Sequence, residues 1–72
     1  MLPLLLVSDV HHNEGLWVEI ALVDPSSATG QGYASMSVFR KDFPGAKPEE
    51  AEAARVATVL AFGERLRSVL AE

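Results

Sequence analysis

Three side chains that can bind a metal or transfer a proton lie within one short stretch of the chain: Asp9, His11 and Glu19. Asp9 and His11 are two residues apart, so in a β-strand they point to the same face. If the chain reverses at Asn13–Gly15, Glu19 joins them from the next strand. Such a cluster can bind a divalent cation or share a proton. The ordinary alternative is a solvated polar strip in which His11 stacks on Trp17.

Other chemical sites find no support in the sequence. There is no cysteine, which excludes a disulfide framework and any cysteine-based zinc or iron–sulfur site. His11 and His12 are adjacent, so in a strand they point to opposite faces and do not chelate as a pair. Gly30-Gln31-Gly32 lacks the Lys-Ser/Thr of a phosphate loop and does not lead into a helix. The sequence predicts no enzyme, no cofactor and no resident metal.

Length and charge narrow the classes of protein further. Seventy-two residues predict a single domain, 1–72, with a small core that association would supplement. The net charge of −4 argues against binding to nucleic-acid phosphates. The apolar opening Met1–Val7 is too short to span a bilayer and has no positively charged flank. We expect a cytoplasmic protein that binds neither nucleic acid nor membrane.

The order of elements follows from a shift in composition along the chain. Residues 4–11, 16–23 and 33–40 are rich in aliphatic and aromatic side chains and predict strands. Gly15 supplies the positive φ of a tight first turn. Residues 48–70, which begin with proline and are rich in Ala, Glu, Arg and Leu, predict a helix. The predicted fold is α+β: a three-stranded antiparallel sheet in the order 1-2-3 with one C-terminal helix packed on one face.

Strand alternation predicts which side chains form the core. If His12 pairs with Leu16, then Val10 pairs with Val18 and Ser8 with Ile20. The core face of the sheet then consists of Leu4, Leu6, Val10, Leu16, Val18, Ile20, Leu22, Ala34, Met36 and Val38. The helix is expected to cover it with the stripe Val56, Val59, Leu60, Leu66 and Leu70. Gly63, within that helix, predicts close packing of helix on sheet.

The opposite face of the sheet is the predicted contact surface, because one helix covers only one face. The same alternation places on it Leu5, His11, Trp17, Glu19, Val23, Tyr33 and Phe39. Exposed aromatic groups of this kind concentrate binding energy at protein interfaces. Pairing of an edge strand, or of the alanine-rich helix surface, with a second copy would give a homodimer.

The β-β-β-α order resembles HicB-type antitoxin domains and double-stranded-RNA binders in topology, although the basic residues of RNA binders are missing. The leading hypothesis is a small, acidic, non-enzymatic interaction protein that is homodimeric and binds another protein. Its size and charge are typical of accessory proteins of phages and mobile elements, including anti-CRISPR-like inhibitors. Two alternatives remain open: a small-ligand or metal-binding domain that uses Asp9, His11 and Glu19, and an antitoxin-like regulator of a basic partner.

Overall fold

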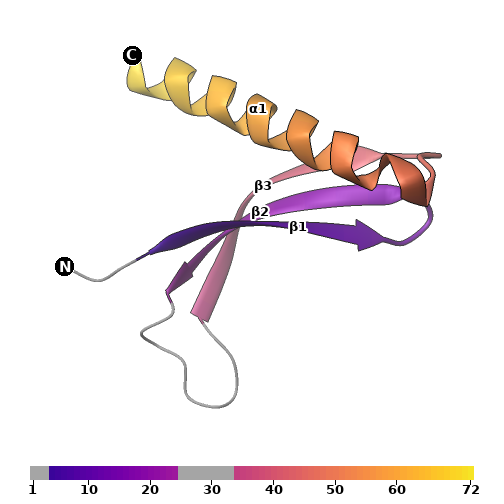
Figure 1. Ribbon diagram of the computed structural model, residues 1–72. Coiled ribbons are helices and arrows are strands. Elements are labelled where there is room, and N and C mark those ends of the chain that lie inside the picture. The colour runs from indigo at the N-terminus through magenta and orange to yellow at the C-terminus, as the bar shows by residue number, and fades with distance from the viewer. Residues whose placement is uncertain (1–3, 25–33) are drawn as a thin grey trace.

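The computed structural model describes residues 4–24 and 34–72. Along the chain follow β1 (Leu5–His12), β2 (Leu16–Asp24), β3 (Ala34–Phe43), one 3₁₀ turn η2 (Pro48–Glu50) and α1 (Ala51–Leu70) (Figure 1). The strands form one antiparallel sheet in the order β1-β2-β3, which confirms the predicted architecture. In the described ranges, no helix combines the length and the apolar character needed to cross a membrane.

The β1–β2 hairpin has the predicted register, with His12 opposite Leu16. Its turn places Glu14 at φ 55° and Gly15 at φ 107°, in the left-handed region that favours glycine. A side chain at position 15 would also lie 3.0 Å from the backbone nitrogen of Gly45. Gly15 therefore serves both the turn and the close approach of the segment that follows β3.

A bulge in β3 changes the predicted alternation. Ile20 pairs with Phe39 and Ala21 pairs with Ser37, so Val38 is an extra residue. From this point to its end, β3 has the opposite parity to the one predicted. The prediction that Phe39 lies on the face away from the helix is therefore wrong: its ring centroid lies 5.6 Å from that of Phe62 in α1.

Alternate residues of β2 form the centre of the core. Leu16, Val18 and Ile20 are buried on the face that α1 covers, as predicted, and Ala54 and Thr58 are the buried residues of the helix. The fully buried Thr58 hydroxyl donates a hydrogen bond to the Ala54 carbonyl at 2.8 Å, so its burial leaves no donor unsatisfied.

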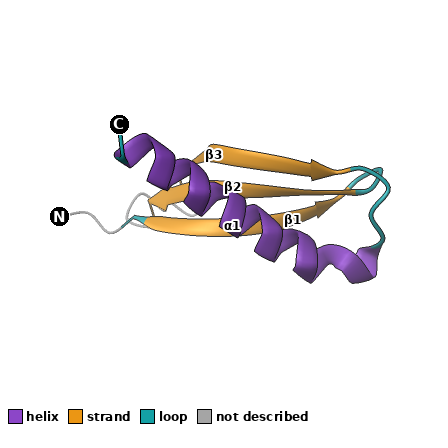
Figure 2. Cartoon of the chain, turned by 90° about the horizontal axis from the view of Figure 1, so that it is seen from above, coloured by secondary structure: helices purple, strands orange, loops and turns teal. Residues whose placement is uncertain are grey.

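The helix begins at Pro48, as expected, and its first turn is of 3₁₀ type. The backbone N–H of Lys47 donates a hydrogen bond to the Glu50 carboxylate at 2.8 Å. This bond satisfies one backbone donor at the start of the helix, although the Lys47 side chain is a poor N-cap. From there α1 crosses the sheet diagonally (Figure 2) and diverges from the strands toward its C-terminus (Figure 1).

The predicted face of the helix is wrong. The buried and half-buried residues of α1 are Ala51, Ala54, Thr58, Ala61 and Phe62. The first four are small and follow one another at a spacing of three or four residues, and Phe62 lies next to Ala61. Most of the stripe expected there, Val56, Leu60, Leu66 and Leu70, is exposed, with Leu60 at 65% and Leu70 at 82%. Val59 is 47% exposed but still borders the sheet, where it lines a hollow with Leu6 and Ile20. At 3.6 residues per turn the two surfaces are centred roughly 140° apart around the helix. Small side chains let the helix axis approach β2 closely, and the larger aliphatic stripe is left outside.

Candidate functional site

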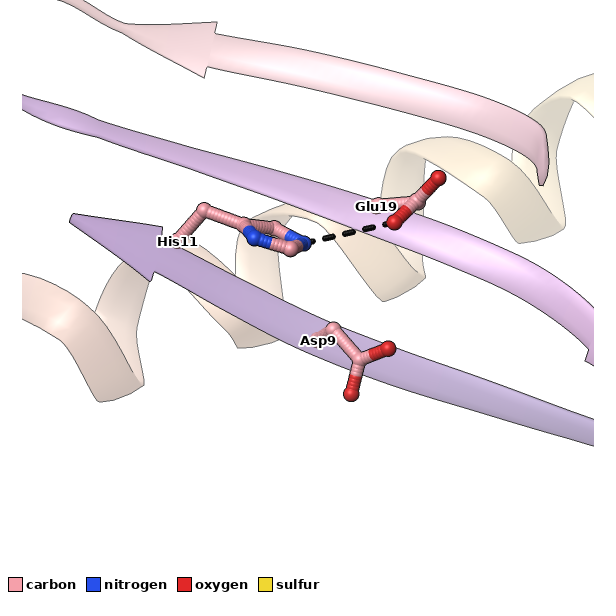
Figure 3. Close-up of side chains that lie close together, drawn as sticks. All are labelled: Asp9, His11 and Glu19. Carbon is pink, nitrogen blue, oxygen red and sulfur yellow. Dashed lines mark hydrogen bonds and ion pairs between the residues drawn. The ribbon is translucent and has the colours of Figure 1, made fainter. Parts of the chain in front are cut away.

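The confirmed hairpin register brings the predicted polar cluster together. Asp9 lies opposite Glu19, and His11 lies opposite Trp17. Trp17 and Glu19 alternate along β2 with the buried Leu16, Val18 and Ile20, and paired residues of neighbouring strands point to the same face. All four side chains therefore lie on the face of the sheet that α1 does not cover. Figure 3 shows the His11 ring turned toward Glu19, with Asp9 further back along the same strand.

The geometry of the cluster is close. Nε2 of His11 lies 3.3 Å from Oε1 of Glu19, and both side chains are partly exposed. One ligand atom from each of Asp9, His11 and Glu19 lies within 4.8 Å of the other two. Among the described residues, no cation contacts the Asp9 carboxylate. Two carboxylates therefore face each other on neighbouring strands, and the imidazole of His11 contacts that of Glu19.

Trp17 orients this imidazole. The two rings are stacked, with centroids 3.8 Å apart and planes inclined by 9°. The guanidinium carbon of Arg40 lies 3.9 Å from the centroid of the indole ring. Two groups this close to one centroid do not fit on the same side, so His11 and Arg40 lie on opposite faces of the indole. Arg40 also donates a hydrogen bond from Nε to Asp42 at 2.8 Å.

The predicted contact residues are therefore divided by the structure. Leu5, His11, Trp17, Glu19 and Val23 share the face away from α1, where Leu5 pairs with Val23. Phe39 lies on the helix side, and Tyr33 is outside the described residues. Both faces of the Trp17 ring are covered by side chains of the same molecule. The use of this face as a protein-contact surface stays a prediction.

A second surface, predicted from the sequence to belong to the core, is more apolar than the open face of the sheet. It is the aliphatic stripe of α1, defined here by Val56, Val59, Gly63, Leu66 and Leu70. These positions are separated by three, four, three and four residues, the spacing by which paired helices pack. Leu60 flanks the stripe. The four large side chains of the stripe, Val56, Val59, Leu66 and Leu70, are all more than 40% exposed.

Gly63 belongs to this exposed surface and not to the core. A Cβ atom built at Gly63 has no other atom within 4 Å among those tested, so the prediction that Gly63 allows close packing of helix on sheet is wrong. Glycine in a helix interior costs about 1 kcal/mol relative to alanine. Nothing within the described chain offsets that cost.

Two exposed ion pairs flank the stripe along α1, Glu52 with Arg55 and Glu64 with Arg67. The hydrogen bond from the Arg55 guanidinium, followed by its positive charge, lowers the pKa of the Glu52 carboxyl from its usual value. These pairs keep the helix surface polar beside the stripe.

Comparison with known proteins gives no match: no protein-family model, no curated protein and no solved structure resembles the chain significantly.

Proposed function

We propose that this chain is a protein-interaction domain that forms a homodimer through the aliphatic stripe of α1. The observation that supports it is the exposure of Val56, Val59, Leu66 and Leu70 along one side of a helix that turns a different side to its own sheet. Large contiguous apolar surfaces on a small protein indicate a contact with another macromolecule.

The chain as a whole exposes more surface than a compact monomer. Its accessible surface is 5378 Å², whereas a compact monomer of this mass exposes about 4,400 Å². A stable interface of standard size buries ~800 Å² on each partner, so a contact of that size would require more of the exposed surface than the stripe's side chains alone.

The stripe is complementary to itself about Gly63. A two-fold axis at Gly63 with antiparallel helices places Val56 beside Leu70 of the second copy and Val59 near its Leu66. Two glycines at the crossing point allow the helix axes to approach closely, which accounts for a residue that the monomer does not use. Parallel packing would instead bring together the glutamates of the two first helical turns, Glu49, Glu50 and Glu52.

Sedimentation equilibrium over a range of protein concentrations tests this function. The wild-type chain is expected to show the mass of two copies at high micromolar concentration. Leu66→Lys places a charge in the stripe and should leave a folded monomer, since Leu66 is 41% exposed. Ala57→Lys is the matched control: it adds the same charge at an exposed position on the opposite flank of the helix and should leave the dimer intact.

Two results would refute the homodimer. One is a monomeric mass at every concentration, which would leave the stripe for a different protein. The other is a Leu66→Lys variant that dimerises as well as the wild type. Loss of the dimer in Leu5→Lys but not in Leu66→Lys would place the interface on the open face of the sheet.

A further inference from the structure

We propose that Asp9, His11 and Glu19 form a binding site for one divalent transition-metal ion of the zinc or cobalt type. This site lies on the face of the sheet away from α1 and does not depend on the proposed dimer. Its ligands come from two paired strands whose register is fixed, with Asp9 directly opposite Glu19.

The separations fit such an ion. Zinc binds imidazole nitrogen and carboxylate oxygen at 2.0–2.2 Å, so neighbouring ligands of a tetrahedral site lie roughly 3.4 Å apart. His11 Nε2 and Glu19 Oε1 already lie 3.3 Å apart. The Asp9 carboxylate lies within 4.8 Å of both ligand atoms, and it is exposed, so a small rotation about its side-chain bonds closes the site.

The electrostatics of the cluster favour a cation. Like charges directly opposite on neighbouring strands are destabilising. Arg40 of β3 pairs with Glu19, but its side chain interacts with Trp17 and Asp42. No ion pair in the described chain neutralises Asp9. A dication between Asp9 and Glu19 replaces their repulsion with attraction to both.

The type of ligand selects the type of metal. Magnesium and calcium prefer oxygen ligands throughout, whereas imidazole suits zinc, cobalt, nickel and iron. Stacking on Trp17 holds the imidazole plane, which reduces the ordering that metal binding requires. Three protein ligands on an exposed face leave the remaining coordination positions to water.

The test is a calorimetric titration of the full chain, without a polyhistidine tag, with Zn²⁺ and separately with Mg²⁺. We expect one Zn²⁺ per chain, and Zn²⁺ should bind more tightly than Mg²⁺. Asp9→Asn, His11→Ala and Glu19→Gln should each weaken Zn²⁺ binding by about tenfold or more. His12→Ala is the matched control, because its side chain points to the other face of β1, and it should leave the affinity unchanged.

Trp17 gives a second, local readout because it is the chain's only tryptophan. Co²⁺ bound at His11 lies against the indole and should quench its fluorescence, with saturation at the same metal concentration as in calorimetry. Repeating both measurements in the Leu66→Lys variant separates this site from the dimer. The proposal is overturned by the absence of binding at millimolar Zn²⁺, by equal losses in His11→Ala and His12→Ala, or by equal affinity for Mg²⁺ and Zn²⁺.

Discussion

Replacement of Gly63 by alanine should stabilise the monomer. Gly63 lies in the interior of α1, its φ is not in the left-handed region, and a Cβ there meets no atom within 4 Å. The helix gains about 1 kcal/mol from the higher propensity of alanine. For a domain of this size, that corresponds to a rise of about 4–8 °C in the melting temperature. Circular dichroism at low micromolar concentration, in the Leu66→Lys background, measures this effect without a contribution from association.

Gly45→Ala is the control for this experiment. A Cβ at Gly45 also meets nothing within 4 Å, but Gly45 has φ 79°, where an L-residue is strained by roughly 1–2 kcal/mol. The two substitutions add the same methyl group to open space and should change stability in opposite directions. A lower melting temperature for Gly63→Ala would refute the reasoning, because it would mean that Gly63 is packed within the monomer.

Three further perturbations follow from the packing and charges of the described residues. Ile20→Ala should lower the free energy of unfolding by about 2–5 kcal/mol, because Ile20 is buried at the centre of the core. Met36→Ala on the same face should lower it little, since Met36 is 60% exposed. Urea denaturation of the two variants measures the difference. Phe62→Ala should remove the contact with Phe39 and cost about 1–2 kcal/mol, less than a fully buried phenylalanine, while Ser68→Ala on the same helix serves as its control. Arg55→Ala should raise the pKa of Glu52 in an NMR titration, because Arg55 lowers that pKa in the wild type. The pair stabilises the folded chain above the pKa that Glu52 has when unfolded, and this stabilisation is lost as the pH falls through the lowered pKa of the folded state. An unchanged Glu52 titration in Arg55→Ala would show that the pair does not form in solution.

The register of the first hairpin could be predicted because one local feature determines it. A tight turn at Asn13–Gly15 fixes which residues of β1 and β2 face each other, and strand alternation then assigns every side chain to a face. The pairing of Asp9 with Glu19 and the stack of His11 on Trp17 follow from that turn alone.

The bulge in β3 could not be predicted from alternation within residues 33–40. Its signal lies beyond the expected end of the strand. Phe39 and Phe43 are four residues apart, and Arg40 and Asp42 alternate with them, so a strand continued to Phe43 turns both aromatic rings to the helix and both charges away. The predicted strand, residues 33–40, does not contain this pattern, because β3 continues to Phe43.

The contact face of α1 was predicted wrongly because the helix has two apolar surfaces. The spacing of Val56, Val59, Leu60, Leu66 and Leu70 predicts the surface with the larger side chains. The sheet instead contacts Ala54 and Thr58, whose small volume allows a close approach to Val18. When a helix carries one stripe of small residues and one of large residues, the small residues can pack against the rest of the domain. The large residues are then free to contact another molecule.

The dimer of α1 can be tested most directly with a single cysteine, because the chain has none of its own. A disulfide requires Cα atoms about 4.4–6.8 Å apart, a distance that the proposed crossing provides only near Gly63. Under mild oxidation, Gly63→Cys is expected to form a covalent dimer rapidly, and Ala57→Cys, on the opposite flank of the same helix, is not. Equal rates for the two variants, or faster cross-linking at position 57, would contradict the interface.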